Sequence, residues 1–168
     1  MHYLVLVPFI LQMLVILFDE YYFHLKRGLP LWERIGHPID TLTVFACLIF
    51  VITIPYSPLM LKWYISLCVL SCLMVTKDEW VHKHVCPASE QWLHALLFVN
   101  HPIMLASVGL IWCCMTPSSA PSWVVHWIGA TPHLLLFLKT QVVAISVFFL
   151  YQVIYWNFIW KEEKEQLQ

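Results

Sequence analysis

Five long apolar runs divide the chain, and short polar stretches separate them. The runs cover about Tyr3–Phe18, Thr41–Ile54, Pro58–Thr76, Leu93–Met115 and His133–Trp160. A helix needs roughly 20 apolar residues to cross a bilayer, and these runs lack the period-two alternation of barrel strands of about ten residues. The pattern therefore predicts an all-α integral membrane protein with about five transmembrane helices.

Prolines mark the predicted helix boundaries. Pro30, Pro38, Pro55, Pro58, Pro87, Pro117, Pro121 and Pro132 lie at or near them. A proline does least harm there, because the first turn of a helix leaves its N–H groups unpaired in any case. The second run is short, and we expect its helix to extend back towards Glu33. The segment 121–128 contains two tryptophans and is too short to span a bilayer, so we expect an interfacial helix over Ser122–Ile128.

Composition supports the same class. Of the 168 residues, 61% are hydrophobic and 11% are charged, against roughly 25% charged in a soluble domain. The whole chain, 1–168, is thus expected to form one membrane domain with lipid as its surroundings and no room for a soluble catalytic domain. The formal net charge of −1 gives no support to nucleic-acid binding.

Basic residues predict the orientation. If five helices alternate, one side of the membrane collects most of them: Lys26, Arg27, Arg34, Lys77, Lys83, Lys161 and Lys164. The other side has Lys62, with Lys139 near the start of the last span. By the positive-inside tendency we expect an outside N-terminus and a cytoplasmic C-terminus.

Two polar segments break the apolar pattern, and they resemble each other. "DEYYFH" followed by "LPLWERIGH" corresponds to "DEWVHKH" followed by "CPASEQWLH". The two segments contain seven of the ten acidic residues and six of the nine histidines. We predict an internal repeat of two tandem helical hairpins, about 3–54 and 58–115, which form a four-helix bundle, with the last span 133–160 beside it.

Each predicted helix of the repeat presents a carboxylate and an imidazole four residues apart, and residues at that spacing share a helix face. The expected metal ligands are Glu20, His24, Glu33, His37, Asp78, Glu79, His82, Glu90 and His94. Asp78 and Glu79 are alternatives for one position, as are His82 and His84. Asp19, Asp40 and His101 are expected to be extra ligands or to hydrogen-bond the ligands. Both segments should meet at the cytoplasmic side, where four carboxylates and four imidazoles supply two metal ions.

This ligand set resembles that of the ferritin-like diiron-carboxylate proteins. In that family a four-helix bundle supplies one Glu from each of two helices and Glu-x-x-His from each of the others. Here the spacing is Glu-x-x-x-His, as in Glu33–His37 and Glu90–His94, and all four helices carry a pair. The resemblance implies two metal ions, iron first, while mixed oxygen and nitrogen ligands also suit zinc or manganese. Of the six cysteines, only Cys86 lies beside the polar segments.

Three classes of function follow. The first is a di-iron oxidoreductase that hydroxylates or desaturates a lipid or another hydrophobic substrate at the cytoplasmic leaflet. The second is a zinc-dependent membrane hydrolase, in which the metal lowers the pKa of a bound water. The third is a non-enzymatic metal or proton transporter, or a haem-binding bundle. Transport is the least supported, because the outer halves of the first four spans offer few polar residues beyond Gln12 and Lys62.

Overall fold

The computed structural model describes residues 2–77, 79, 82, 84, 86–116, 120–129 and 132–160. Within these ranges every regular element is a helix, and there is no strand. In chain order the elements are the 3₁₀-helix η1 (His2–Leu6), α1 (Val7–Asp19), the π-helix η2 (Glu20–His24), α2 (Leu25–Arg27), α3 (Leu31–Thr53), α4 (Pro58–Thr76), α6 (Ala88–Cys114), α7 (Ser122–Ile128), α8 (Pro132–Ile154) and the π-helix η3 (Tyr155–Ile159).

Five helical stretches are long and apolar enough to cross a membrane. They are Tyr3–Arg27, Leu31–Thr53, Pro58–Thr76, Ala88–Cys114 and His133–Ile159. These stretches confirm the predicted all-helical chain with five candidate spans and suggest a multi-pass membrane protein.

Two helices extend beyond the apolar runs of the sequence. The first helical stretch continues past Phe18, through η2, to Arg27. Pro38 lies inside α3 and not at its start. A proline leaves one backbone carbonyl of its helix without a hydrogen bond. Groups on neighbouring helices can pair with that carbonyl, so the proline is tolerated within the span.

Local sequence sets several helix ends. Ser57 caps α4, since its Oγ accepts a hydrogen bond from the N–H of Met60 at 3.2 Å, and Pro58 follows at the first helical position. At the end of α2, Gly28 has a φ of 76°, which favours glycine. A Cβ at Gly28 would lie 2.5 Å from the Trp160 ring, so space and conformation both require glycine at this turn.

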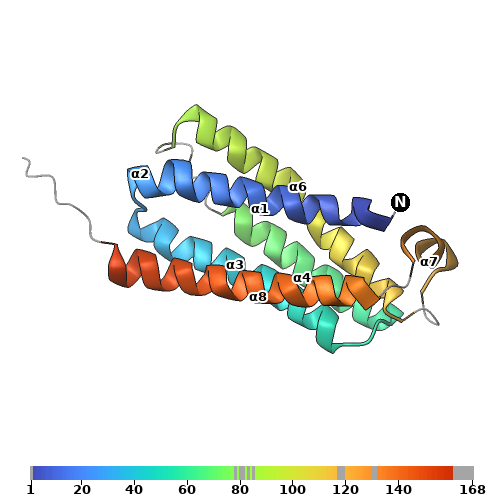
Figure 1. Cartoon of the computed structure of the whole chain (residues 1–168). Coiled ribbons are helices and arrows are strands. Elements are labelled where there is room, and N and C mark those ends of the chain that lie inside the picture. The colour runs from blue at the N-terminus through green and yellow to red at the C-terminus, as the bar shows by residue number, and fades with distance from the viewer. Residues whose placement is uncertain are drawn as a thin grey trace, which may run out of the picture.

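The helices form an elongated bundle (Figure 1). Helix α1 packs along α6, and α3 packs along both α4 and α8. The N-terminus and α7 lie at one end of the bundle, and α2 lies at the other. Because α8 packs on α3 as extensively as α4 does, the last span is an integral part of the bundle.

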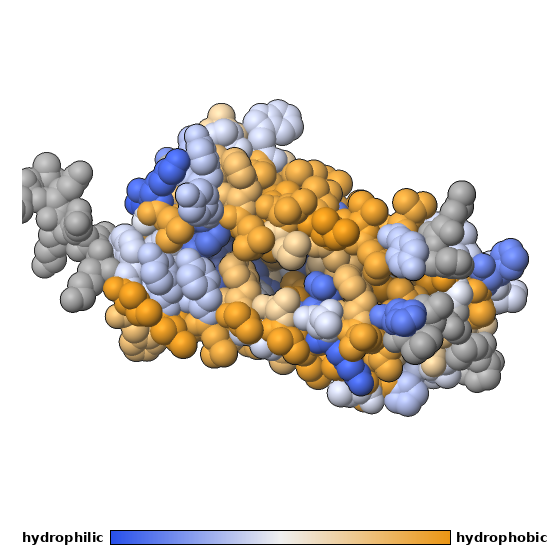
Figure 2. Space-filling view, viewed as in Figure 1, coloured by the Kyte–Doolittle hydropathy of each residue, from blue (hydrophilic) through white to orange (hydrophobic). Residues whose placement is uncertain are grey.

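The apolar core fills the end of the bundle near α7. Trp112, Ile111 and Val108 of α6 are almost completely buried there against Leu48 and Val51 of α3. The visible outer surface of the helices is largely hydrophobic (Figure 2), as expected for surfaces that face lipid. The buried charged side chains therefore lie at the opposite end of the bundle, near α2.

Candidate metal centre

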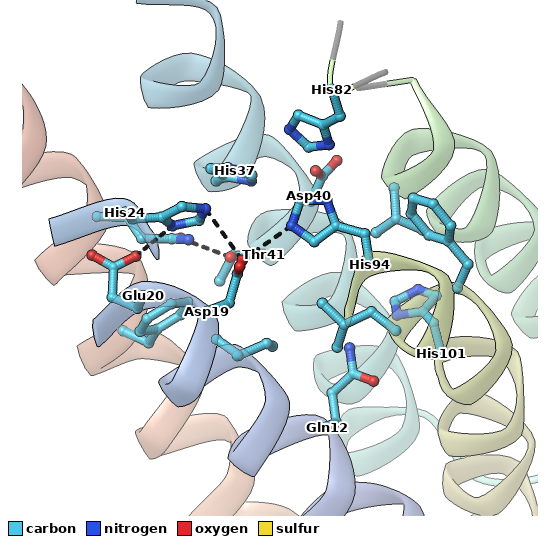
Figure 3. Close-up of a pocket in the computed structure, with 16 residues that line it drawn as sticks. Gln12, Asp19, Glu20, His24, His37, Asp40, Thr41, His82, His94 and His101 are labelled. Carbon is cyan, nitrogen blue, oxygen red and sulfur yellow. Dashed lines mark hydrogen bonds and ion pairs between the residues drawn. The ribbon is translucent and has the colours of Figure 1, made fainter. Parts of the chain in front are cut away.

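Histidines and carboxylates from separate helices meet at the end of the bundle that carries α2 (Figure 3). We call this group the polar cluster. Its members are Asp19, Glu20, His24, Glu33, His37, His82, Glu90 and His94. All are buried except His37, which is half-buried. Six of the eight line a cavity of about 110 Å³, so the cluster has both polar atoms and internal space.

A π-helical turn brings both acids of the Asp19-Glu20 pair to His24. The N–H of Leu25 donates to the carbonyl oxygen of Glu20, five residues earlier. In a regular α-helix the i,i+4 residue Glu20 would be the acid that shares a face with His24. Here the carboxylates of Glu20 and Asp19 lie 2.9 Å and 3.2 Å from the two ring nitrogens of His24. Such turns are frequent at functional sites.

Asp19 also connects α1 with α6. Its Oδ2 lies 3.2 Å from Nε2 of His94, within hydrogen-bond distance. Oε1 of Glu90, one turn earlier on α6, lies 3.8 Å from Nε2 of His24. Asp19, which the sequence placed among the supporting residues, is therefore at the centre of the cluster.

Glu20 lies behind His24 and takes a supporting position. Its Oε2 is 2.9 Å from Nδ1 of His24, while its Oε1 accepts the O–H of Tyr151 at 2.6 Å and the indole N–H of Trp156 at 2.9 Å. In the tautomer that carries its proton on Nδ1, His24 donates to this carboxylate, and its Nε2 is then the ligand atom that faces Asp19. A carboxylate that orients a ligating histidine in this way is a recurrent feature of metal sites.

Arg27 joins the two glutamates that begin α3 and α6. Its Nη2 lies 3.0 Å from Glu33 and 2.8 Å from Glu90, and both carboxylates are fully buried. The imidazole Nε2 atoms of His82 and His37 lie 3.4 Å and 4.0 Å from Glu33. The two predicted Glu-His pairs thus converge, but a guanidinium already neutralises part of their charge.

The charges of the cluster do not balance. Among the described residues, its four carboxylates have one guanidinium, so three negative charges remain while the carboxylates are ionised and the imidazoles are neutral. Buried charge without a partner is costly in a protein interior, and more so within a membrane. These described groups therefore favour additional positive charge, from metal ions or from protons on the imidazoles or carboxylates.

Unpartnered atoms gather in the same place. Among the described residues, nine buried side-chain nitrogen and oxygen atoms have no hydrogen-bond partner, and seven of them belong to the polar cluster. They are Asp19 Oδ1, His24 Nε2, His37 Nε2, His82 Nδ1, His82 Nε2, Glu90 Oε2 and His94 Nδ1. Buried polar atoms are normally paired, because leaving one unpaired costs about 1–3 kcal/mol. Neutral imidazole nitrogens and carboxylate oxygens are also metal ligands.

Within the described part of the chain, three groups have ligand atoms close enough to share an ion. In each group the ligand atoms lie within 4.8 Å of one another. The groups are Asp19, His24, Glu90 and His94; His24, Glu33 and His37; and Glu33, His82 and Cys86. These buried groups could hold a metal ion, and because they share His24 and Glu33 they form one continuous site.

Two other predicted residues lie deeper and have protein partners. Asp40 forms an ion pair with Nζ of Lys77 at 2.7 Å. Nε2 of His101 is 3.0 Å from the hydroxyl of Ser71, and its Nδ1 has no hydrogen-bond partner within the described part of the chain. Both residues line the cavity of the polar cluster, without belonging to a ligand group.

The segment between α4 and α6 brings one of its predicted ligands into the cluster. His82 is buried there, whereas the side chains of Glu79 and His84 are exposed. Asp78 lies outside the described residues. Of the alternatives that the sequence left open, His82 has the position of a ligand.

Cys86 borders the polar cluster, and its thiol stays protonated. The thiol is buried beside Glu33 and His82. Burial, and then the negative charge of Glu90, raise the pKa of the Cys86 thiol to about 12. The thiol is therefore neutral near pH 7 in the metal-free protein.

Sequence reasoning missed three residues of the site. Arg27 counted only towards orientation, although it follows His24 by three residues and so lies near it on a helix. Tyr151 and Trp156 belong to the last span and contact Glu20 across the bundle. No spacing within the chain indicates that contact, since it depends on where α8 packs.

No protein family, curated protein or solved structure matches this chain. The chemistry of the site therefore has to be inferred from its own geometry.

Proposed function

We propose that this protein is a multi-pass membrane metalloenzyme that holds two metal ions in the polar cluster and oxidises a hydrophobic substrate. One observation carries the proposal: seven buried ligand atoms have no hydrogen-bond partner among the described residues, and they lie in one cluster with excess negative charge. Metal ions satisfy both deficits at once, because they accept lone pairs and supply positive charge.

The ligand atoms divide into two sets. Asp19, His24, Glu90 and His94 would hold the first ion, as two carboxylates and two imidazoles around one point. Glu33 would hold the second ion with His37 and His82. Glu20 would keep His24 in its ligating orientation, and Arg27 would balance the remaining charge of the glutamates.

Iron is the metal we favour, because the carboxylate-rich set with imidazoles matches the ligand preferences of iron. The proposed reaction is hydroxylation or desaturation of a lipid-like molecule. In hydroxylation one atom of dioxygen enters a C–H bond and the other becomes water, with two electrons from a separate electron-transfer protein and two protons from water. The cluster would supply the metal for this chemistry beside the hydrocarbon region.

Similar starts of α3 and α6 support the proposed internal repeat. Pro30 and Pro87 precede the two helices with nearly identical backbone angles, φ −64° and ψ 157° against φ −64° and ψ 156°. Glu33 and Glu90 occupy the third position of their helices, and Arg27 binds both. We propose that the two halves, 3–54 and 58–115, arose from one helical hairpin.

We also propose that the N-terminus is outside and that the polar cluster faces the cytoplasm. Lys26, Arg27, Arg34 and Lys77 lie at the α2 end of the bundle, which supports this orientation. At the other end, α7 exposes Trp123 and Trp127 and buries Val124 and Ile128. That distribution supports an interfacial helix with aromatic anchors.

The test is oxygen consumption by the reconstituted protein. Detergent-purified protein is loaded with ferrous iron without oxygen, mixed with membrane lipid and a ferredoxin-type donor, and exposed to oxygen. We expect oxygen uptake coupled to lipid products that carry one added oxygen atom or one new double bond. The zinc-loaded protein is the matched control. Oxygen uptake equal to that control would rule out the oxidoreductase.

A zinc hydrolase is the second candidate, because Asp19, His24, Glu90 and His94 alone form a compact four-residue group. Catalytic zinc sites use three such ligands and keep the fourth position for water, so three of these residues would bind the zinc. Hydrolysis of a lipid ester by the zinc-loaded protein, lost on chelation, would favour this candidate over iron chemistry.

A further inference from the structure

A long apolar groove separates α1 from α8. Its volume is about 700 Å³, and the surface between these helices is hollowed (Figure 2). Successive turns of α1 form one wall and successive turns of α8 form the other, with Val44 and Leu48 of α3 between them. Over their described residues, α1 packs mainly on α6 and α8 packs mainly on α3. The two helices meet where the rings of Phe9 and Phe137 pack edge to face, with their centroids 5.0 Å apart.

The groove borders the cavity of the polar cluster. Gln12, Ile16, Glu20, Thr41 and Phe148 line both spaces. The end near the cluster therefore has hydrogen-bonding groups, while the far end is bounded by apolar side chains such as that of Phe9. A molecule that occupies the groove would have an apolar body and would lie directly beside the candidate metal ligands.

The rims of the groove face the surroundings of the bundle. Met13, Leu17 and Val147 line the groove and are more than half exposed, at 51%, 52% and 62%. All three lie inside candidate membrane spans, where the surrounding solvent is lipid. The groove is thus open sideways to the bilayer, and a lipid can enter without crossing water.

The dimensions of the groove match one acyl chain. It follows α1 from Phe9 to Glu20, which at 1.5 Å per residue is about 16 Å. Half of a hydrocarbon core of about 30 Å is about 15 Å. A chain that extends through one leaflet therefore has the length of the groove.

We propose that the groove binds one acyl chain of a membrane phospholipid and places it against the polar cluster. The chain enters between α1 and α8 while its headgroup stays at the membrane surface near Glu20 and Tyr151. The carboxylate of Glu20 makes this end unsuited to the charged carboxylate of a free fatty acid. The inference rests on the proposed function, to which it adds the substrate class and its route.

The test is photo-crosslinking in vesicles of phosphatidylethanolamine that contain a small fraction of the same lipid with a diazirine on one acyl chain. After illumination, crosslinked peptides are located by mass spectrometry. We expect labels on the groove-facing residues of α1 and α8, among them Met13 and Val147. Ala144→Trp, which adds a large ring inside the groove, should lower this labelling at least tenfold.

A matched control fills a different groove. Ala106 lines a second apolar groove of about 730 Å³ between α4 and α6, so Ala106→Trp adds the same ring elsewhere and should leave the α1 and α8 labelling unchanged. Val147→Trp at the exposed rim is a second blocking variant if Ala144→Trp does not fold. Labelling of α1 and α8 that survives both blocking variants would overturn the proposal, as would equal labelling of all lipid-facing helices in the parent.

Metal content, measured on the same samples, separates this inference from the proposed function. Stoichiometric metal without selective labelling of α1 and α8 overturns the acyl-chain groove and leaves the metal centre standing. Selective labelling without metal supports the groove as a lipid site and overturns the metalloenzyme. Both blocking variants should retain the metal content of the parent.

Discussion

The two ends of the bundle differ in whether their buried polar groups are hydrogen-bonded. Near α7, the indole N–H of Trp112 donates to the carbonyl of Ile54 at 2.7 Å, and the hydroxyl of Tyr64 donates to that of Leu105 at 2.6 Å. Near α2, the polar cluster contains seven buried atoms without a hydrogen-bond partner within the described residues. One end has the polar pairing that stability requires, and the other retains unsatisfied groups that packing alone does not explain.

Arg27 offers the largest expected effect at the cluster end. Arg27→Gln leaves the carboxylates of Glu33 and Glu90 buried without their cation, and breaking a buried pair costs roughly 3–5 kcal/mol. We expect a large fall in the thermal midpoint of the metal-free protein, with partial recovery on adding divalent metal. Arg34→Gln is the control, because Arg34 stacks on Trp160 and bonds a backbone carbonyl. Equal losses in both variants would contradict the charge imbalance.

Trp112 tests the apolar end. Trp112→Ala removes a buried indole and its hydrogen bond, which costs about 3 kcal/mol when the site does not collapse. We expect a lower thermal midpoint with unchanged metal content. Removing a metal ligand should instead lower the metal content. Trp123→Ala on the exposed face of α7 should change neither. Loss of metal in Trp112→Ala would show that the two ends are not independent.

Glu20 should have a smaller, graded effect. In Glu20→Gln the side chain keeps its size but loses the charge that holds Nδ1–H of His24. Removing a partner that orients a ligand weakens metal affinity about 10–100-fold. Metal titration should show this loss without loss of stoichiometry, and Tyr151→Phe should weaken affinity less. Complete loss of one metal equivalent in Glu20→Gln would instead identify Glu20 as a direct ligand.

The smallest effect concerns Cys86. Its raised pKa of about 12 means that the reactive thiolate becomes abundant only as the pH approaches that value. At pH 8 about one thiol in 10⁴ is ionised, against a substantial fraction for a free cysteine of pKa about 8.5. Alkylation of Cys86 in chelated, folded protein should therefore be slow at pH 8 and accelerate with rising pH. Rates equal to those in denaturant at pH 8 would contradict the buried, neutral thiol.

The sequence could predict what depends on spacing along one helix. The five apolar runs predicted the candidate spans, and i,i+4 spacing predicted the pairing of Glu20 with His24. The π-turn that adds Asp19 was not predictable, because it depends on the polar partners that α6 and α8 supply. Tyr151 is likewise a product of packing between distant segments. Arg27 was visible, but its role depends on the approach of Glu90 from another helix.

The most direct test of the account is the metal content of detergent-purified protein. Elemental analysis compares the parent with a variant that carries both His24→Ala and His94→Ala, and with His126→Ala as a control on the exposed face of α7. We predict about two equivalents of iron or zinc in the parent and in the control, and loss of metal in the double variant. Metal-free parent protein, even after reconstitution with ferrous iron or zinc, would contradict the metal centre and leave the cluster as a protonated polar network.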